Sequence, residues 1–85
     1  MRIRVLYFAA AREAAGTHEE ELTVGGEPDR AATIADVLSG AVARHPALAA
    51  VLPSCRTALD QEFAPRTTPL RDGGTLAVLP PVSGG

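Results

Sequence analysis

The most periodic segment of the chain runs from Thr33 to Pro46. Its apolar residues recur at the spacing i, i+3, i+4, i+7 and i+8, which places them on one face of an α-helix. This stripe consists of Ile34, Val37, Leu38, Ala41 and Val42. Thr33 can cap the start of the helix, and the carboxylate of Asp36 is favourable near the positive end of the helix dipole. Pro46 ends the helix. In a chain of 85 residues, which has room for one core, the stripe is most economically buried under a single sheet.

The residues before this helix predict two strands that are joined by a short helical turn. Polar and apolar residues alternate from Arg2 to Tyr7, and apolar residues then continue on both faces through Phe8, which is typical of a strand inside its sheet. Residues 9–15 are rich in helix formers and end at Gly16. Residues 21–24 alternate again, and we expect them to pair with the first strand.

The residues after the long helix predict a short helical piece and then a return to strands. The helical piece covers residues 48–52 and ends before a proline. Residues 56–59 and a short segment around Phe63 are strand candidates, with polar residues between them. Residues 71–74 form a glycine-containing turn, and residues 75–79 are the last strand. This order predicts one α+β domain, in which one mixed sheet is covered by one main helix.

The charge pattern excludes several classes of partner. The net charge is −2, and the basic residues form no cluster of the kind that binds phosphate groups, so nucleic acid is not expected as a partner. No stretch approaches the ~20 apolar residues that span a bilayer. The apolar run from Val5 to Ala11 has only the minimum length of the apolar segment of a signal peptide, and charged residues follow it at once, so we expect no signal peptide. Cys55 is the single cysteine and allows no disulfide within the chain, so we expect a cytoplasmic protein.

Few side chains in the sequence could carry chemistry. His18 and His45 have no metal-ligand spacing, and we interpret both as structural or solvent-facing. Cys55 could hold a persulfide, but a lone cysteine near the start of a strand is more often a small core residue. The glycine pairs at residues 25–26 and 73–74 are interpreted as turns and not as phosphate-binding loops, because no capped helix follows directly on either. The sequence therefore predicts no metal site and no bound cofactor.

The end of the sequence is the remaining candidate for a functional site. Pro80 and Pro81 stop strand pairing and set an extended path for the residues that follow. Gly84 and Gly85 carry no side chains, which permits close approach to the backbone in a narrow site of another protein. Six residues from Pro80 span at most ~20 Å. The sequence therefore predicts a tail whose terminal carboxylate reaches a buried site.

Three stretches of the sequence form a more specific pattern. They are Leu79-Pro80-Pro81-Val82-Ser83-Gly84-Gly85, the preceding Pro69-Leu70-Arg71-Asp72-Gly73, and near the start Leu6-Tyr7-Phe8-Ala9 with residues 11–16. Together they resemble the small subunit of molybdopterin synthase, one of the ubiquitin-like sulfur carriers, over essentially the whole chain. The resemblance implies the β-grasp fold of ubiquitin, with a domain at residues 1–79 and a flexible tail at residues 80–85.

The resemblance implies a protein that carries sulfur and is no enzyme by itself. A partner enzyme would adenylate the Gly85 carboxylate with ATP, and sulfur would then replace the adenylate to give a thiocarboxylate. The tail would enter the large catalytic subunit, where the sulfur attacks cyclic pyranopterin monophosphate to make the dithiolene of molybdopterin. The glycyl adenylate and thioglycine would be covalent intermediates on Gly85.

The resemblance also implies where the partners bind. The surface for the large subunit would include Phe8, Arg12 and Leu79, together with the tail residues Pro80, Pro81, Val82, Ser83 and Gly84. The complex would be a heterotetramer, and the adenylating enzyme would be a second partner.

Two alternatives stay open at this point: a related carrier for thiamine or amino-acid biosynthesis, and a ubiquitin-like modifier that is conjugated to amines. All eight basic residues are arginine, so the chain cannot form lysine-linked chains with itself.

Overall fold

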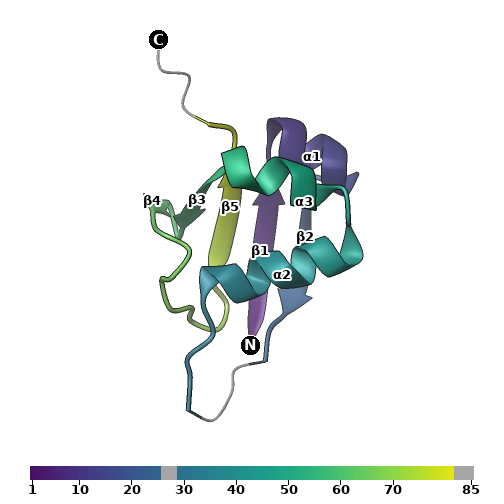
Figure 1. Cartoon of the computed structure of the whole chain (residues 1–85). Helices are drawn as coiled ribbons and strands as arrows, with labels where there is room; N and C mark the ends of the chain where they lie inside the picture. Colours follow the sequence, from purple (N-terminus) through teal and green to yellow (C-terminus); the bar gives the residue numbers. More distant parts are fainter. Residues whose placement is uncertain (26–28, 82–85) are drawn as a thin grey trace.

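A computed structural model describes residues 1–25 and 29–81 of the chain (Figure 1). The strands in this part of the chain form one five-stranded sheet with the order β2-β1-β5-β3-β4. They are β1 (Arg2–Tyr7), β2 (Glu19–Thr23), β3 (Arg56–Leu59), β4 (Glu62–Phe63) and β5 (Thr75–Leu79). The helices are α1 (Ala9–Ala15), α2 (Ile34–Arg44) and α3 (Leu48–Val51), and a 3-10 turn, η1 (Leu52–Ser54), follows α3.

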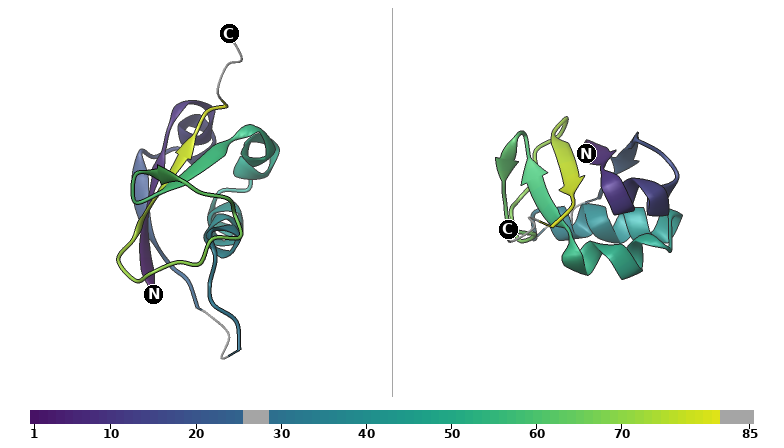
Figure 2. Two further views of the ribbon diagram at one scale, coloured as in Figure 1. Left: turned by 90° about the vertical axis from the view of Figure 1, so that its left-hand side faces the viewer. Right: turned by 90° about the horizontal axis from the view of Figure 1, so that it is seen from above.

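The sheet is mixed, because one pair of neighbouring strands is parallel and the other pairs are antiparallel. β1 and β5 are parallel neighbours, β2 pairs antiparallel with β1, and β3 pairs antiparallel with β5 and β4. Parallel strands need a crossover connection, and here α2 and α3 supply part of it and lie against one face of the sheet (Figure 2). The predicted internal position of the first strand and its pairing with the second are confirmed.

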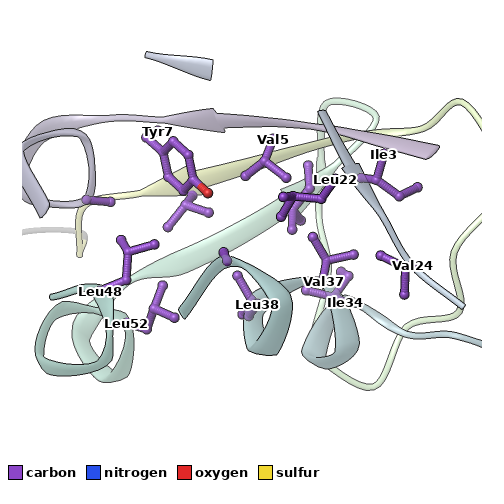
Figure 3. Packing of buried hydrophobic residues seen from close by; sticks show 14 of the residues in the cluster. Ile3, Val5, Tyr7, Leu22, Val24, Ile34, Val37, Leu38, Leu48 and Leu52 are labelled. Carbon is purple, nitrogen blue, oxygen red and sulfur yellow. The ribbon is translucent and has the colours of Figure 1, made fainter. Parts of the chain in front are cut away.

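The long helix α2 begins and ends where the sequence predicts. The carboxylate of Asp36 accepts the backbone N–H of Thr33 at 2.8 Å, and the N–H of His45 donates to the carbonyl of Ala41 at 2.8 Å. Of the predicted stripe, four residues are buried and Val42 is half-buried. Figure 3 shows Val37 and Leu38 directed from α2 toward the side chains of the sheet. The stripe therefore forms the helical half of the core.

β2 begins at Glu19, earlier than the segment 21–24 that alternation predicts. The difference arises from Glu20, a charged residue on the face that the helices cover. Its carboxylate accepts the Tyr7 hydroxyl at 2.6 Å and lies 2.8 Å from Nε2 of His45 and 3.4 Å from Nε of Arg44. Since these partners satisfy the carboxylate, Glu20 can occupy an inward position of the strand.

The buried hydroxyl of Tyr7 predicts a pH dependence. Burial, with the hydrogen bond to Glu20, raises the pKa of Tyr7 above its ordinary value. The folded state therefore favours the protonated hydroxyl. The stabilisation that this preference adds to the free energy of unfolding is present below pH ~10 and is lost as the pH rises further. We expect Tyr7→Phe to lower the free energy of unfolding by about 1 kcal/mol at neutral pH and to remove its decrease above pH ~10. Chemical denaturation of both proteins at about pH 7 and about pH 11 measures the effect, and parallel pH dependences would contradict it.

The polar segment between β3 and β4 is a tight turn. Asp60 and Gln61 have φ angles of 49° and 73°, and Leu59 is paired with Glu62, so two left-handed residues form the loop of a type I′ hairpin. The carboxylate of Asp60 accepts the N–H of Thr75 at 2.9 Å. This bond attaches the hairpin to the start of β5.

Across residues 1–25 and 29–81, every helix is too short or too polar to cross a membrane.

Candidate functional site

The predicted tail starts at the end of a central strand. β5 ends at Leu79, and the exposed residues Pro80 and Pro81 follow; we call these three residues the tail root. Because β5 is parallel to β1, the tail root lies at the end of the sheet where β1 ends, opposite the N-terminus (Figure 1). The other tail residues named above, Val82, Ser83, Gly84 and Gly85, lie outside the described residues.

The structure brings one predicted interface residue, Phe8, to the tail root, of which another, Leu79, is the first residue. Phe8 directly follows β1, donates its N–H to the carbonyl of Val78 at 3.2 Å, and leaves 43% of its surface exposed. Leu79 is half-buried at the end of the neighbouring strand. Arg12 lies on α1, where a guanidinium nitrogen is 2.7 Å from Nε2 of His18 and both side chains are exposed. Their part in an interface stays a prediction.

An apolar row crosses the sheet next to the tail root, on the face opposite α2. The register places Leu6 beside Ala77, Ala77 beside Ala58, and Ala58 beside Phe63, so that four strands each contribute one residue. We call these four residues the apolar row. Leu6 and Ala77 are half-buried, whereas Phe63 at the edge is 62% exposed. The sequence pattern predicts Phe63 on a strand but gives no sign of the row, because only strand register brings its members together.

On β1 and β2, the same face also carries two ion pairs. Arg4 pairs with Glu19 and Arg2 pairs with Glu21, each at 3.3 Å across β1 and β2. Exposed pairs of this kind contribute little to the free energy of unfolding. This face therefore combines the apolar row with charged side chains on β1 and β2.

The thiol of Cys55 is poorly suited to carry sulfur. The residue is half-buried beside the core, and its sulfur donates to the carbonyl of Val51 at 3.4 Å. Burial raises the pKa of the thiol, which lowers the fraction of reactive thiolate at neutral pH. Among the described residues, no three His, Cys, Asp or Glu side chains lie close enough together to hold a metal ion.

These features define a class of protein. A mixed sheet with parallel β1 and β5 at its centre, covered on one face by α2, is the architecture of the ubiquitin-like β-grasp proteins. Among solved structures, the protein SAMP1 of Haloferax volcanii, small archaeal modifier protein 1, superposes with a TM-score of 0.83 at 30% identity over 100% of both chains. The predicted fold is confirmed.

The chain belongs to the ThiS family, whose model matches residues 5–85. It is 45% identical to the molybdopterin synthase sulfur carrier subunit of Chlamydomonas reinhardtii, over 87 residues that cover 100% of both proteins. It is 33% identical over 86 residues to the protein of the same name from Mycobacterium tuberculosis (strain ATCC 25618 / H37Rv), covering 100% of this chain and 99% of that protein. The resemblance inferred from the sequence motifs is confirmed at the level of the family.

Proposed function

We propose that this protein is the sulfur-carrier subunit of a molybdopterin synthase. The observation that carries the proposal is the full-length similarity to two subunits of that name, one of them at 45% identity. The position of the tail root supports it, because β5 places Pro80 and Pro81 at the end of the sheet where the apolar row lies. The domain then serves as a support for the terminal carboxylate.

In the proposed cycle, the carboxylate of Gly85 attacks the α-phosphate of ATP in a partner enzyme, which releases pyrophosphate and leaves a glycyl adenylate. A sulfur nucleophile displaces AMP and gives the thiocarboxylate. This sulfur then attacks cyclic pyranopterin monophosphate in the large subunit. Pro80 and Pro81 reduce the entropy that the tail loses on insertion, and the glycines admit the backbone to a narrow channel.

The large subunit is the proposed partner at the tail root, in a heterotetramer. Exposed apolar side chains that lie together mark interaction surfaces, and Phe8 and Phe63 are the large apolar side chains of this end that are most exposed. Phe8, Leu79 and the apolar row would be covered, and Arg12 would lie at the margin. The chain itself contributes the sulfur and no catalytic side chain.

Reconstitution tests the proposed function. The chain is loaded with ATP, an adenylating enzyme and a sulfur source, and it is then mixed with the large subunit and cyclic pyranopterin monophosphate. We expect dithiolene product in proportion to the thiocarboxylate that is consumed. A loaded chain that binds the large subunit and yields no dithiolene would contradict the proposal.

Substitution of the cysteine separates the tail from the thiol as the carrier of sulfur. We expect Cys55→Ser to support the wild-type rate of dithiolene formation, because the mobile sulfur is on the Gly85 carbonyl. The change should cost less than about 1 kcal/mol, since the residue is half-buried. Loss of product in a folded Cys55→Ser protein would instead place the sulfur on the thiol.

A second candidate function is conjugation to other proteins. The structural similarity to small archaeal modifier protein 1 favours it, because that protein is 30% identical to this chain. The reconstituted mixture distinguishes the two functions: covalent adducts on partner proteins without dithiolene would favour the modifier. A carrier for thiamine or amino-acid biosynthesis would load with sulfur and give no dithiolene.

A further inference from the structure

A hollow with a volume of about 380 Å³ lies beside the tail root, along the β3–β4 edge of the sheet. Two arginines, Arg56 and Arg66, line it together with Phe63 and Cys55. We call it the arginine hollow. Phe63 also ends the apolar row, so the hollow and the row are one continuous surface.

Arg56 connects the hollow to the tail root. It is the register partner of Leu79, the last residue of β5. Its guanidinium carbon lies 4.2 Å from the centre of the Phe63 ring, a cation–π contact that holds the exposed side chain over the hollow. A group bound by Arg56 would therefore lie next to the start of the tail.

Arg66 brings a second positive charge to the hollow in a fixed position. One of its terminal nitrogens donates to the carbonyl oxygens of Leu52 and of Cys55, the latter at 3.2 Å. These bonds attach the segment after β4 to η1, and the side chain is half-buried. A guanidinium has five N–H groups, so one nitrogen used in this way leaves others able to donate.

Within the described part of the chain, no carboxylate balances the charges of the hollow. Arg2, Arg4 and Arg44 pair with glutamates and Arg30 pairs with Asp36. Among residues 1–25 and 29–81, neither Arg56 nor Arg66 forms an ion pair with a carboxylate. The arginine hollow is therefore a local positive site on a chain whose net charge is −2.

We propose that the arginine hollow binds an acidic side chain of the large subunit when the tail enters that subunit. The inference rests on the proposed function and adds the chemistry of the partner surface. A carboxylate fits the planar donor groups of arginine, and the Phe63 ring excludes water from one side of the contact. Complementary charge at the margin of an interface speeds association and fixes orientation, so the contact would align the tail with its channel.

The test measures the association rate constant with the large subunit at about 50 mM and about 300 mM NaCl. We expect Arg56→Gln to slow association by about threefold to tenfold at low salt and to reduce the salt dependence. Arg66→Gln should act in the same direction, and Arg56→Lys, which keeps the charge, should keep most of the rate. Arg71→Gln is the matched control, because Arg71 is an exposed arginine just before β5, at the far end of that strand.

Wild-type rates and salt dependences in both glutamine variants would overturn the inference. An equal effect of Arg71→Gln would also overturn it, since net charge alone would then account for the result. Arg56→Gln removes no hydrogen bond to the backbone, so its result holds even if Arg66→Gln loosens the segment after β4. If the wild-type chain forms dithiolene and the variants associate at the wild-type rate, only the inference about the arginine hollow is overturned and the proposed function stands. If the wild-type chain does not bind the large subunit, the proposed function and this inference fail together.

Discussion

Removal of Gly85 is expected to abolish sulfur loading and to leave the fold intact. The deletion shortens the tail by ~3.3 Å and withdraws the carboxylate from the position at which, in the proposed cycle, it reaches the α-phosphate of ATP in the adenylating enzyme. A misplacement of about 1 Å can cost about 100-fold in rate, so the loss should exceed this factor. Because β5 ends at Leu79, the free energy of unfolding should be unchanged. Intact-protein mass spectrometry after reaction with ATP, enzyme and a sulfur source detects the exchange of oxygen for sulfur.

Two further variants control for effects other than the position of the carboxylate. A chain with one residue appended after Gly85 should also fail to load, since its carboxylate is displaced in the other direction. Ser83→Ala keeps the length of the tail and should load at the wild-type rate. A truncated chain that still gained the mass of the exchange would show that the carboxylate of Gly85 is not the acceptor of sulfur.

Truncation of the α2 stripe is expected to remove a large part of the stability. Val37 and Leu38 are 0% and 5% exposed, so Val37→Ala or Leu38→Ala should lower the free energy of unfolding by ~2–4 kcal/mol. A domain of this size has a total of only ~4–13 kcal/mol. Chemical denaturation measures the loss, with Val42→Ala as the matched control, because this half-buried valine of the same stripe should cost less. A loss below about half a kcal/mol for Val37→Ala would show that the wrong face of the helix is assigned to the core.

The fold was predictable where local signals and burial agree. α2 has a polar cap, a regular stripe and a terminating proline, and β1 and β5 alternate between a buried and an open face. The start of β2 was not predictable, because Glu20 interrupts the alternation and its partners Tyr7 and His45 are distant in sequence. A charged residue in a short segment carries no local sign that another element will satisfy it.

The candidate site was likewise predictable only in part. The tail is contiguous, so its prolines and glycines can be recognised as one motif in the sequence. The apolar row brings together Leu6, Ala58, Phe63 and Ala77, which strand register alone makes neighbours. Two of these residues are alanines, whose small side chains contribute only a weak hydrophobic pattern to a short segment. Arg56 and Arg66 likewise become a pair only when the β3–β4 hairpin is formed.

The position of β5 between β1 and β3 has a mechanical consequence. A pull on the tail acts along the axis of β5, and strands on both sides hold it by hydrogen bonds that are loaded together in shear. An edge strand pulled away sideways would instead release its bonds one after another. Traction through the tail root would therefore load the bonds to both neighbouring strands at once. In the proposed function, the folded domain would then act as a stop that limits how far the chain can be drawn into a channel.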